Sequence, residues 1–229
     1  MSPDPALTVR LAARAMARHN LVHAYGHVSM RLDAARFLVS SARPLGTIGA
    51  EDRGVIVRLD GDLPAGVLGE VRVHREIYRL RPDVGGICRI QPFSLMALSV
   101  LGETPRALHG LGTYFAPCPP LWDGVALLRD DTAARAVAER LGSANAIVMR
   151  GNGGVTVGSS LPEAACHAFF LEDAARLEVA LLPSRDAGHP PREYSAGEAR
   201  ARAVPAGGLY DRMWQYLCFG DPEWPVILN

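Results

Sequence analysis

The chain has 229 residues and carries 24 basic and 24 acidic side chains, so its formal net charge at neutral pH is zero. No block of Lys or Arg stands out, and we therefore expect neither a nucleic acid nor an anionic membrane as partner. Hydrophobic residues make up 48% of the chain, enough for one core in a single domain. No apolar run approaches the roughly 18 residues that span a bilayer.

The four cysteines are widely spaced and form no Cys-x-x-Cys pair. The first residues lack the basic-then-apolar pattern of a secretion signal. We therefore expect free thiols and a cytoplasmic location.

The first quarter of the chain predicts one helix followed by a meander of strands. Asp4 is a suitable N-cap for a helix to about residue 19, in which apolar residues recur every four positions. The Asp60-Gly61 pair predicts a tight hairpin after the third strand. The predicted strands are Val28–Leu32, Phe37–Ser40 and Val55–Leu59.

The middle of the chain predicts helices on both sides of a strand. A helix over Glu70–Leu80 should end before Pro82, because the residue that precedes a proline is pushed out of the helical region. A strand over Gly86–Gln91 and a helix over Pro92–Leu101 follow. The Pro- and Gly-rich stretch Thr104–Asp123 is expected to be a long ordered loop of the kind that carries function.

The last part of the chain predicts a helix over Ala133–Leu141, and then strands Ala146–Met149 and Val155–Val157 around a Gly-rich turn. A long helix capped by Ser160 should run to about Leu182. Residues 183–207 are typical of a linker with a short helix over Ala196–Ala203, and Leu209–Leu217 has the pattern of a docking helix. We treat 1–182 as the main unit and 183–229 as a tail of the same domain.

Five short segments occur in a characteristic order: Gly26-His27-Val28-Ser29, Glu70 with His74, Arg81-Pro82-Asp83-Val84-Gly85, Ala97-Leu98-Ser99-Val100-Leu101-Gly102 and Val155-Thr156-Val157-Gly158. In order and spacing they resemble the class II aldolase/adducin family over roughly residues 6 to 182. The resemblance implies an α/β fold, a three-layer α/β/α sandwich with a largely antiparallel central sheet. It also implies a C4 homotetramer whose active sites lie between adjacent subunits.

Enzymes of that family hold a divalent metal ion with three histidines, and the matching positions here are Arg89, Gln91 and Asn152. A guanidinium has no lone pair to offer a metal, and amide oxygens are weak ligands for zinc. Arg89 can instead replace the cation and bind a carboxylate or an oxyanion, with the two amides as neutral donors. The alternative is that Arg89 pairs with an acidic residue across strands and is structural. We expect neither a metal nor another cofactor.

Three residues are candidates for proton transfer. Glu70 matches the acid/base carboxylate of the family, although a glutamate in the first turn also complements the helix dipole. His27 is a second candidate because imidazole titrates near neutral pH, but a histidine at a turn is more often only hydrogen-bonded. Tyr114 can replace, from a neighbouring subunit, a family tyrosine whose position is Gly110 here. The alternative for Tyr114 is a packing role.

The substrate is expected to be a small carboxylate without a phosphate group. The hydroxyl and amide groups that hold phosphate in the sugar-phosphate aldolases are replaced here by Leu68-Gly69, Ala42-Arg43 and His27. Arg43 and Arg89 can instead grip a carboxylate, since planar donors match two oxygens. His109 matches a histidine of many relatives and is assigned to substrate binding.

These residues predict a metal-independent carbon–carbon lyase, a decarboxylase or an aldol-type enzyme, that acts on a small carboxylate such as a hydroxyaromatic acid. Loss of all three metal ligands leaves open a non-catalytic scaffold like the adducin head domain. An isomerase or cyclase that uses the same proton-transfer groups is a third interpretation. Replacement of the ligands by polar groups favours an enzyme, because a scaffold has no need of donors that converge on one point.

No transition metal should be held by Arg89, Gln91 and Asn152, because the guanidinium repels a dication and two amides supply too little affinity. Elemental analysis after exhaustive dialysis is the test, and stoichiometric zinc, manganese or iron in this pocket would contradict the prediction. The comparison variant restores histidine at all three positions, although the groups that would orient the new ligands are not in place.

Overall fold

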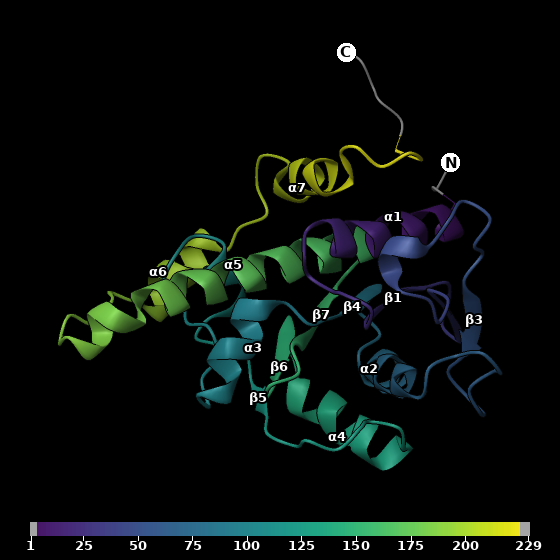
Figure 1. Cartoon of the computed structure of the whole chain (residues 1–229), viewed down its shortest axis with the longest axis horizontal. Coiled ribbons are helices and arrows are strands. Elements are labelled where there is room, and N and C mark those ends of the chain that lie inside the picture. The colour runs from purple at the N-terminus through teal and green to yellow at the C-terminus, as the bar shows by residue number, and fades with distance from the viewer. Residues whose placement is uncertain (1–3, 225–229) are drawn as a thin grey trace.

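A computed structural model describes residues 4–224, and every structural statement below refers to them. The centre of the fold is a seven-stranded sheet in the order β3-β2-β1-β4-β7-β6-β5 (Figure 1). All neighbouring strands are antiparallel except β5 and β6, which are parallel. The strands are β1 (His27–Arg31), β2 (Arg36–Val39), β3 (Val55–Arg58), β4 (Gly86–Ile90), β5 (Leu121–Trp122), β6 (Ala146–Met149) and β7 (Gly154–Gly158).

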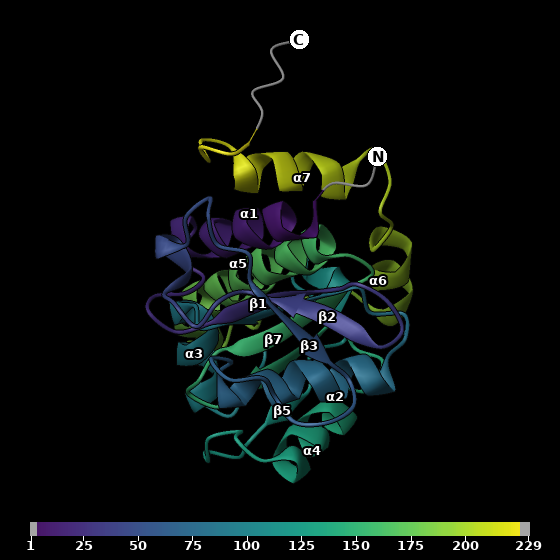
Figure 2. The same cartoon turned by 90° about the vertical axis from the view of Figure 1, so that its right-hand side faces the viewer.

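Helices cover both faces of this sheet. Helices α1 and α5 lie on one face and α2 and α4 on the other, and α7 lies outside α1 and α5 (Figure 2). The predicted three-layer α/β/α sandwich with a largely antiparallel sheet is therefore confirmed. The α-helices are α1 (Pro5–Arg18), α2 (Arg72–Leu80), α3 (Phe93–Val100), α4 (Asp131–Leu141), α5 (Leu161–Asp186), α6 (Ala196–Arg202) and α7 (Leu209–Cys218), and the 3-10 helices are η1 (Leu45–Thr47), η2 (Gly69–Val71) and η3 (Gly112–Phe115).

Strand β4 is the middle strand, and its side chains alternate between two separate cores. Cys88 and Ile90 belong to the core under α1 and α5, whereas Ile87 belongs to the core under α2 and α4. All three side chains are fully buried. Arg89 is the residue that breaks this apolar pattern on the α2/α4 face. Apolar packing does not explain a charged side chain at this position.

The turn between β6 and β7 is pressed against the end of β4. Gly153 has a φ of +73°, and a Cβ atom on it would lie 2.1 Å from the carbonyl oxygen of Ile90. Glycine is therefore required at this position. The close approach holds Asn152 next to the end of the strand that carries Arg89.

Two predicted segments differ from the structure. The hairpin after β3 is wrong: β3 is an edge strand, Asp60 is bound by Arg58, and the chain leads on to η2 without forming a further strand within the described residues. Among the described residues, short hairpins of this sheet instead join β1 to β2 and β6 to β7. The long helix continues past Leu182 to Asp186 and includes Pro183.

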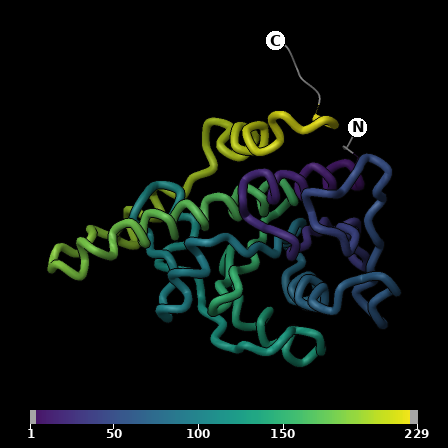
Figure 3. Tube along the Cα trace, viewed as in Figure 1, coloured from purple at the N-terminus to yellow at the C-terminus, as the bar shows by residue number. Residues whose placement is uncertain are grey.

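The C-terminal segment lies against the first helix. Helix α7 contacts both α5 and α1, as the trace shows (Figure 3). Beyond it, Arg14 of α1 donates two hydrogen bonds of 2.8 Å to the carboxylate of Asp221, whose side chain is fully buried. Within residues 4–224, no helix is long and apolar enough to cross a lipid bilayer.

Replacing Asp221 with alanine should lower the free energy of unfolding by about 3 kcal/mol, because it leaves the buried guanidinium of Arg14 with fewer partners. Urea denaturation measures this change. The control is Asp60→Ala, which removes an exposed partner of Arg58 and should change the free energy of unfolding much less, because solvent screens an exposed ion pair. Equal effects of the two variants would contradict the assignment.

The Arg14–Asp221 pair also predicts that the free energy of unfolding depends on pH. Burial is the largest single effect and raises the pKa of Asp221, but hydrogen bonds from Arg14, the backbone N–H of Glu223 and Arg18, together with the charge of Arg14, hold that pKa below its usual value. A lowered folded-state pKa means that the contribution is present above the ordinary pKa of aspartate and is lost as the pH falls through the lowered value. Asp221→Ala should therefore lose less stability on acidification than the wild-type protein.

Candidate active site

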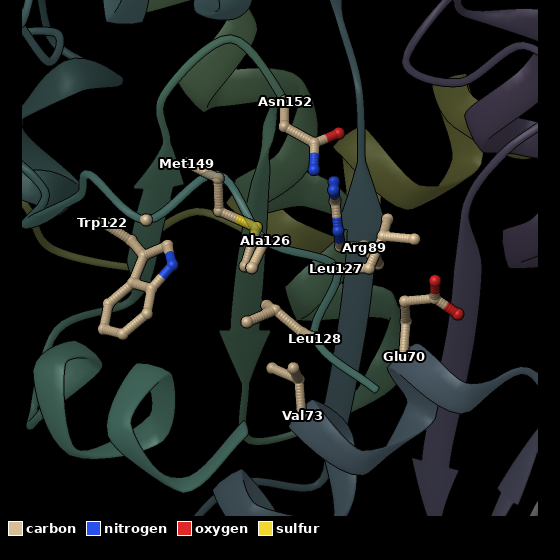
Figure 4. A pocket seen from close by; sticks show the side chains of 10 residues that line it. Glu70, Val73, Arg89, Trp122, Ala126, Leu127, Leu128, Met149 and Asn152 are labelled. Atoms are coloured by element: carbon tan, nitrogen blue, oxygen red, sulfur yellow. The ribbon is translucent and has the colours of Figure 1, made fainter. Parts of the chain in front are cut away.

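A cleft opens on the α2/α4 face of the sheet, between the start of α2, the end of β4 and the segment 124–128 (Figure 4). Its cavity volume is about 30 Å³, and beyond that the cleft is open to solvent. Three residues that the sequence selected lie in its wall, namely Glu70, Arg89 and Asn152. They come from three different elements and converge on one end of the cleft.

Arg89 carries a positive charge without a bonded acid. Its Nη1 donates to the carbonyl oxygens of Ile90 at 2.5 Å and Gly154 at 3.4 Å. Within residues 4–224 it forms no ion pair, and its Nε and Nη2 donate to no protein acceptor, so the alternative of a cross-strand pair is wrong. Burial lowers the pKa of Arg89 to about 10, against the opposing charge of Glu70. The guanidinium therefore stays charged at neutral pH and keeps donors for a ligand.

Gln91 and Asn152 bind each other. Nε2 of Gln91 donates to Oδ1 of Asn152 at 2.6 Å. The amide nitrogen of Asn152 is turned toward Arg89 (Figure 4). The three positions that match the metal ligands of the family, Arg89, Gln91 and Asn152, thus present hydrogen-bond donors and a positive charge. These residues do not fit a divalent cation. Across residues 4–224 there is also no cluster of three His, Cys, Asp or Glu side chains suited to a metal.

Glu70 stands at the mouth of the cleft. It lies in η2, immediately before α2, and its side chain is 26% exposed. Nε of Arg129 donates to its Oε1 at 3.0 Å. This contact orients the carboxylate and leaves Oε2 without a partner in the described part of the chain, so one oxygen is available to accept a proton.

His27 is on β1, directly opposite Arg89 of β4. Its ring is buried, and Nδ1 lies 2.8 Å from Nε2 of His74. Burial, with a smaller effect from the charge of Arg89, lowers the pKa of His27 to about 3. The expectation that His27 titrates near neutral pH is therefore wrong. At neutral pH the imidazole is uncharged.

Tyr114 is not in the cleft. It lies in η3 on the opposite face of the sheet, where its ring packs with His167, Phe170 and Tyr210. The ring is 9% exposed, and the hydroxyl is buried without a hydrogen-bond partner in residues 4–224. Within its own subunit Tyr114 therefore packs in the core, and its catalytic role toward a neighbouring subunit stays a prediction.

His109 and Arg43 also lie outside this cleft. His109 faces α5, with Nε2 3.8 Å from a carboxylate oxygen of Asp173. Arg43 is in an exposed loop, 3.8 Å from Glu51. Neither residue lines the cleft of its own subunit, so the structure does not bring the two predicted carboxylate-binding arginines together.

Sequence reasoning did not select the apolar wall of the cleft. It is formed by side chains from α2, β5, β6 and the segment before α4, which are far apart in the chain, so no local pattern connects them. Among them, Trp122 has an indole nitrogen that is buried without a hydrogen-bond partner in the described residues. The wall comprises Val73, Trp122, Leu127, Leu128 and Met149.

The cleft is therefore an apolar slot with donors and one carboxylate at its end. Aromatic and aliphatic walls accept a flat apolar ring, while a few placed polar groups fix its orientation. Arg89 and Asn152 suit an anionic oxygen on that ring, and Glu70 suits a proton that moves during reaction.

Comparison with known proteins supports this fold and identifies the family. Decarboxylase NovR of Streptomyces niveus is 32% identical over an aligned length of 172, and the alignment covers 64% of this chain and 62% of NovR, so this chain spans less than two thirds of that relative. A 3,4-dihydroxyphthalate decarboxylase of Terrabacter sp. (strain DBF63) is 27% identical over 172 residues, 67% of this chain and 71% of the relative.

Among solved structures, an aldolase II superfamily protein from Pseudomonas syringae superposes with a TM-score of 0.78 and 21% identity. The superposition covers 95% of this chain and 92% of that one, and at this identity it shows the fold alone. The family model described as Class II Aldolase and Adducin N-terminal domain matches residues 8–179. The chain therefore belongs to the class II aldolase and adducin family.

Proposed function

We propose that this protein is a decarboxylase that releases carbon dioxide from a hydroxyaromatic carboxylate without a bound transition metal. The observation that carries the proposal is Arg89, a charged guanidinium with free donors at the end of an apolar cleft. Keeping such a charge partly buried without a bonded acid is costly, and an anionic ligand would offset that cost. The names of the two similar decarboxylases support this reaction class.

In the proposed reaction a proton moves from the ring hydroxyl to the ring carbon, and the bond between that carbon and the carboxylate breaks. Glu70 takes the proton of the ring hydroxyl and returns it to the ring carbon that bears the carboxylate. The carbon–carbon bond then breaks, and its electron pair passes through the ring to the hydroxyl oxygen as carbon dioxide leaves. Arg89 stabilises the negative oxygen. A proton from water restores the hydroxyl group.

The scaffold and isomerase interpretations have less support. A scaffold needs no unpaired cation in a cleft, and an isomerase or cyclase would use the same groups without releasing carbon dioxide. We also propose a cytoplasmic homotetramer. Its support is an exposed apolar surface on and just after α3, close to the turn that holds Asn152. The exposed side chains are Phe93, Val100 and Leu101.

Glu70→Gln should lower kcat by about a hundredfold or more and change KM little, since the amide keeps the shape and loses the capacity to carry a proton. Carbon dioxide release from a panel of hydroxyaromatic carboxylates is the assay. Glu51→Gln, a change at an exposed carboxylate outside the cleft, should leave the rate unchanged. A fully active Glu70→Gln protein would show that another group moves the proton.

Arg89→Lys should weaken binding of a hydroxyaromatic carboxylate by about tenfold, because lysine retains the charge and loses the planar pair of donors. Quenching of Trp122, which lines the cleft, reports binding, and Trp122→Phe identifies its share of the signal. Arg43→Lys is the matched variant outside the cleft and should bind normally. Unchanged affinity of the Arg89→Lys protein would contradict the anion site.

A further inference from the structure

A chain of four buried side chains runs from His27 away from the cleft. Nδ1 of His27 lies 2.8 Å from Nε2 of His74, and Nδ1 of His74 lies 2.6 Å from Oγ of Ser29. Oγ of Ser29 in turn lies 3.0 Å from the hydroxyl of Tyr78. None of the four residues is more than 4% exposed. The sequence contains a signal for this arrangement, because alternate residues of β1 face the helix and residues 74 and 78 are four apart on it.

The far end of the chain determines the direction of every hydrogen bond in it. Within residues 4–224, Oγ of Ser29 is the hydrogen-bond partner of the Tyr78 hydroxyl, so the phenol must donate to it. Ser29 then donates to Nδ1 of His74, and His74 donates from Nε2 to Nδ1 of His27. His27 is left with its proton on Nε2.

Reversing the donor and acceptor in each of these hydrogen bonds is unfavourable. If His27 donated from Nδ1 and every bond were reversed, the hydroxyl hydrogen of Tyr78 would be buried without an acceptor. Buried donors without partners are rare because the lost hydration is not replaced. The two hydroxyl groups thus select one tautomer of each histidine.

The charged groups around the chain keep both imidazoles neutral. Arg89 lies beside His27 on the next strand, and the guanidinium of Arg31 lies 4.6 Å above the ring of Tyr78. No carboxylate among the described residues bonds to any member of the chain. Burial is the main cause that lowers the pKa of both histidines; the charge of Arg89 adds to it at His27, and His27 and then Arg89 add to it at His74. Burial also raises the pKa of Tyr78, so the phenol remains a donor.

The charge of Arg89 also bears on the tautomer of His27. His27 and Arg89 are direct partners on antiparallel strands, so both side chains lie on the face that bears the cleft. A positive charge beside an imidazole favours a lone pair, not an N–H, on the ring nitrogen nearest to it. The hydrogen bonds of Ser29 and Tyr78 fix the tautomer of His27 next to this charge.

We propose that His74, Ser29 and Tyr78 are positioning residues that hold His27 as a neutral Nε2–H donor beside Arg89. The N–H of His27 and the guanidinium then bind the same oxygen of the substrate, the ring oxygen that becomes negative as carbon dioxide leaves. This assignment rests on the proposed decarboxylation for the identity of that oxygen. The tautomer itself depends only on the hydrogen bonds of the protein.

The first test is nitrogen NMR of the full-length protein labelled at histidine, near neutral pH, with signals assigned by single His→Gln variants. His27 and His74 should each carry a proton on Nε2 and none on Nδ1. A proton on Nδ1 of His27, or an imidazolium at either position, would overturn the proposal. This measurement needs no substrate, so it is independent of whether the decarboxylase assignment is correct.

The second test removes both hydroxyls in Ser29→Ala/Tyr78→Phe, which keeps the aromatic ring in the core. The His27 signal should shift toward the Nδ1–H tautomer, and kcat should fall by about tenfold or more with little change in KM. Ser29→Thr, which restores the hydroxyl, should retain the wild-type tautomer. Ser40→Ala is the control, since Ser40 is a buried serine that accepts a bond from Val28 on the neighbouring strand and lies outside the chain.

The outcomes separate the two proposals. If the protein has the Nε2–H tautomer but releases no carbon dioxide, the positioning of His27 is supported and the decarboxylase proposal is contradicted. If the wild-type protein releases carbon dioxide but the double variant keeps the same tautomer, the decarboxylase proposal is supported and the positioning role of Ser29 and Tyr78 is contradicted. A double variant that fails to fold leaves the wild-type tautomer and the Ser29→Thr protein as the deciding measurements.

Discussion

The register of β4 between β1 and β7 is the constraint on which the site depends. Arg89 is opposite His27 on one side and Val155 on the other, so all three side chains share one face of the sheet. A shift of one residue would turn Arg89 into the core under α1 and α5. The Gly153 turn, which no larger residue can replace, holds the neighbouring Asn152 at the same end of the strand.

Desolvation gives this site its chemistry. In the cleft, Arg89 shares the wall with apolar side chains and with Glu70, whose carboxylate already binds Arg129. The local charge at the positions of Arg89, Gln91 and Asn152 is therefore positive. A guanidinium supplies that charge in a fixed planar form and binds oxygen through hydrogen bonds, so it suits an anion but cannot exchange ligands as a metal does.

Burial also separates the roles of the two proton-bearing groups. Glu70 remains in contact with solvent, which allows it to exchange a proton during a catalytic cycle. His27 is sealed next to a positive charge, so it stays neutral and can act through a hydrogen bond only. The hydroxyls behind His74 decide which end of His27 carries the hydrogen. In the proposed reaction Glu70 moves the proton, and Arg89 and His27 stabilise charge.

The sequence by itself determined the family, the layer architecture and the loss of the metal ligands. Motif order reflects the packing of consecutive elements, and the inability of Arg89 to bind a metal is a property of the residue type in any surroundings. The sequence also identified Glu70 and Asn152, because each lies next to an element boundary that local pattern predicts.

Only the tertiary structure decided which candidates meet. Tyr114 and Arg89 are both compatible with a functional site in the sequence, yet they lie on opposite faces of the sheet. The apolar wall around Trp122 comes from segments that no local pattern connects. The ionisation of His27 depends on its burial and on Arg89, a residue 62 positions away in the chain. Burial and electrostatic fields are sums over neighbours in space, and those neighbours exist only once the chain has folded.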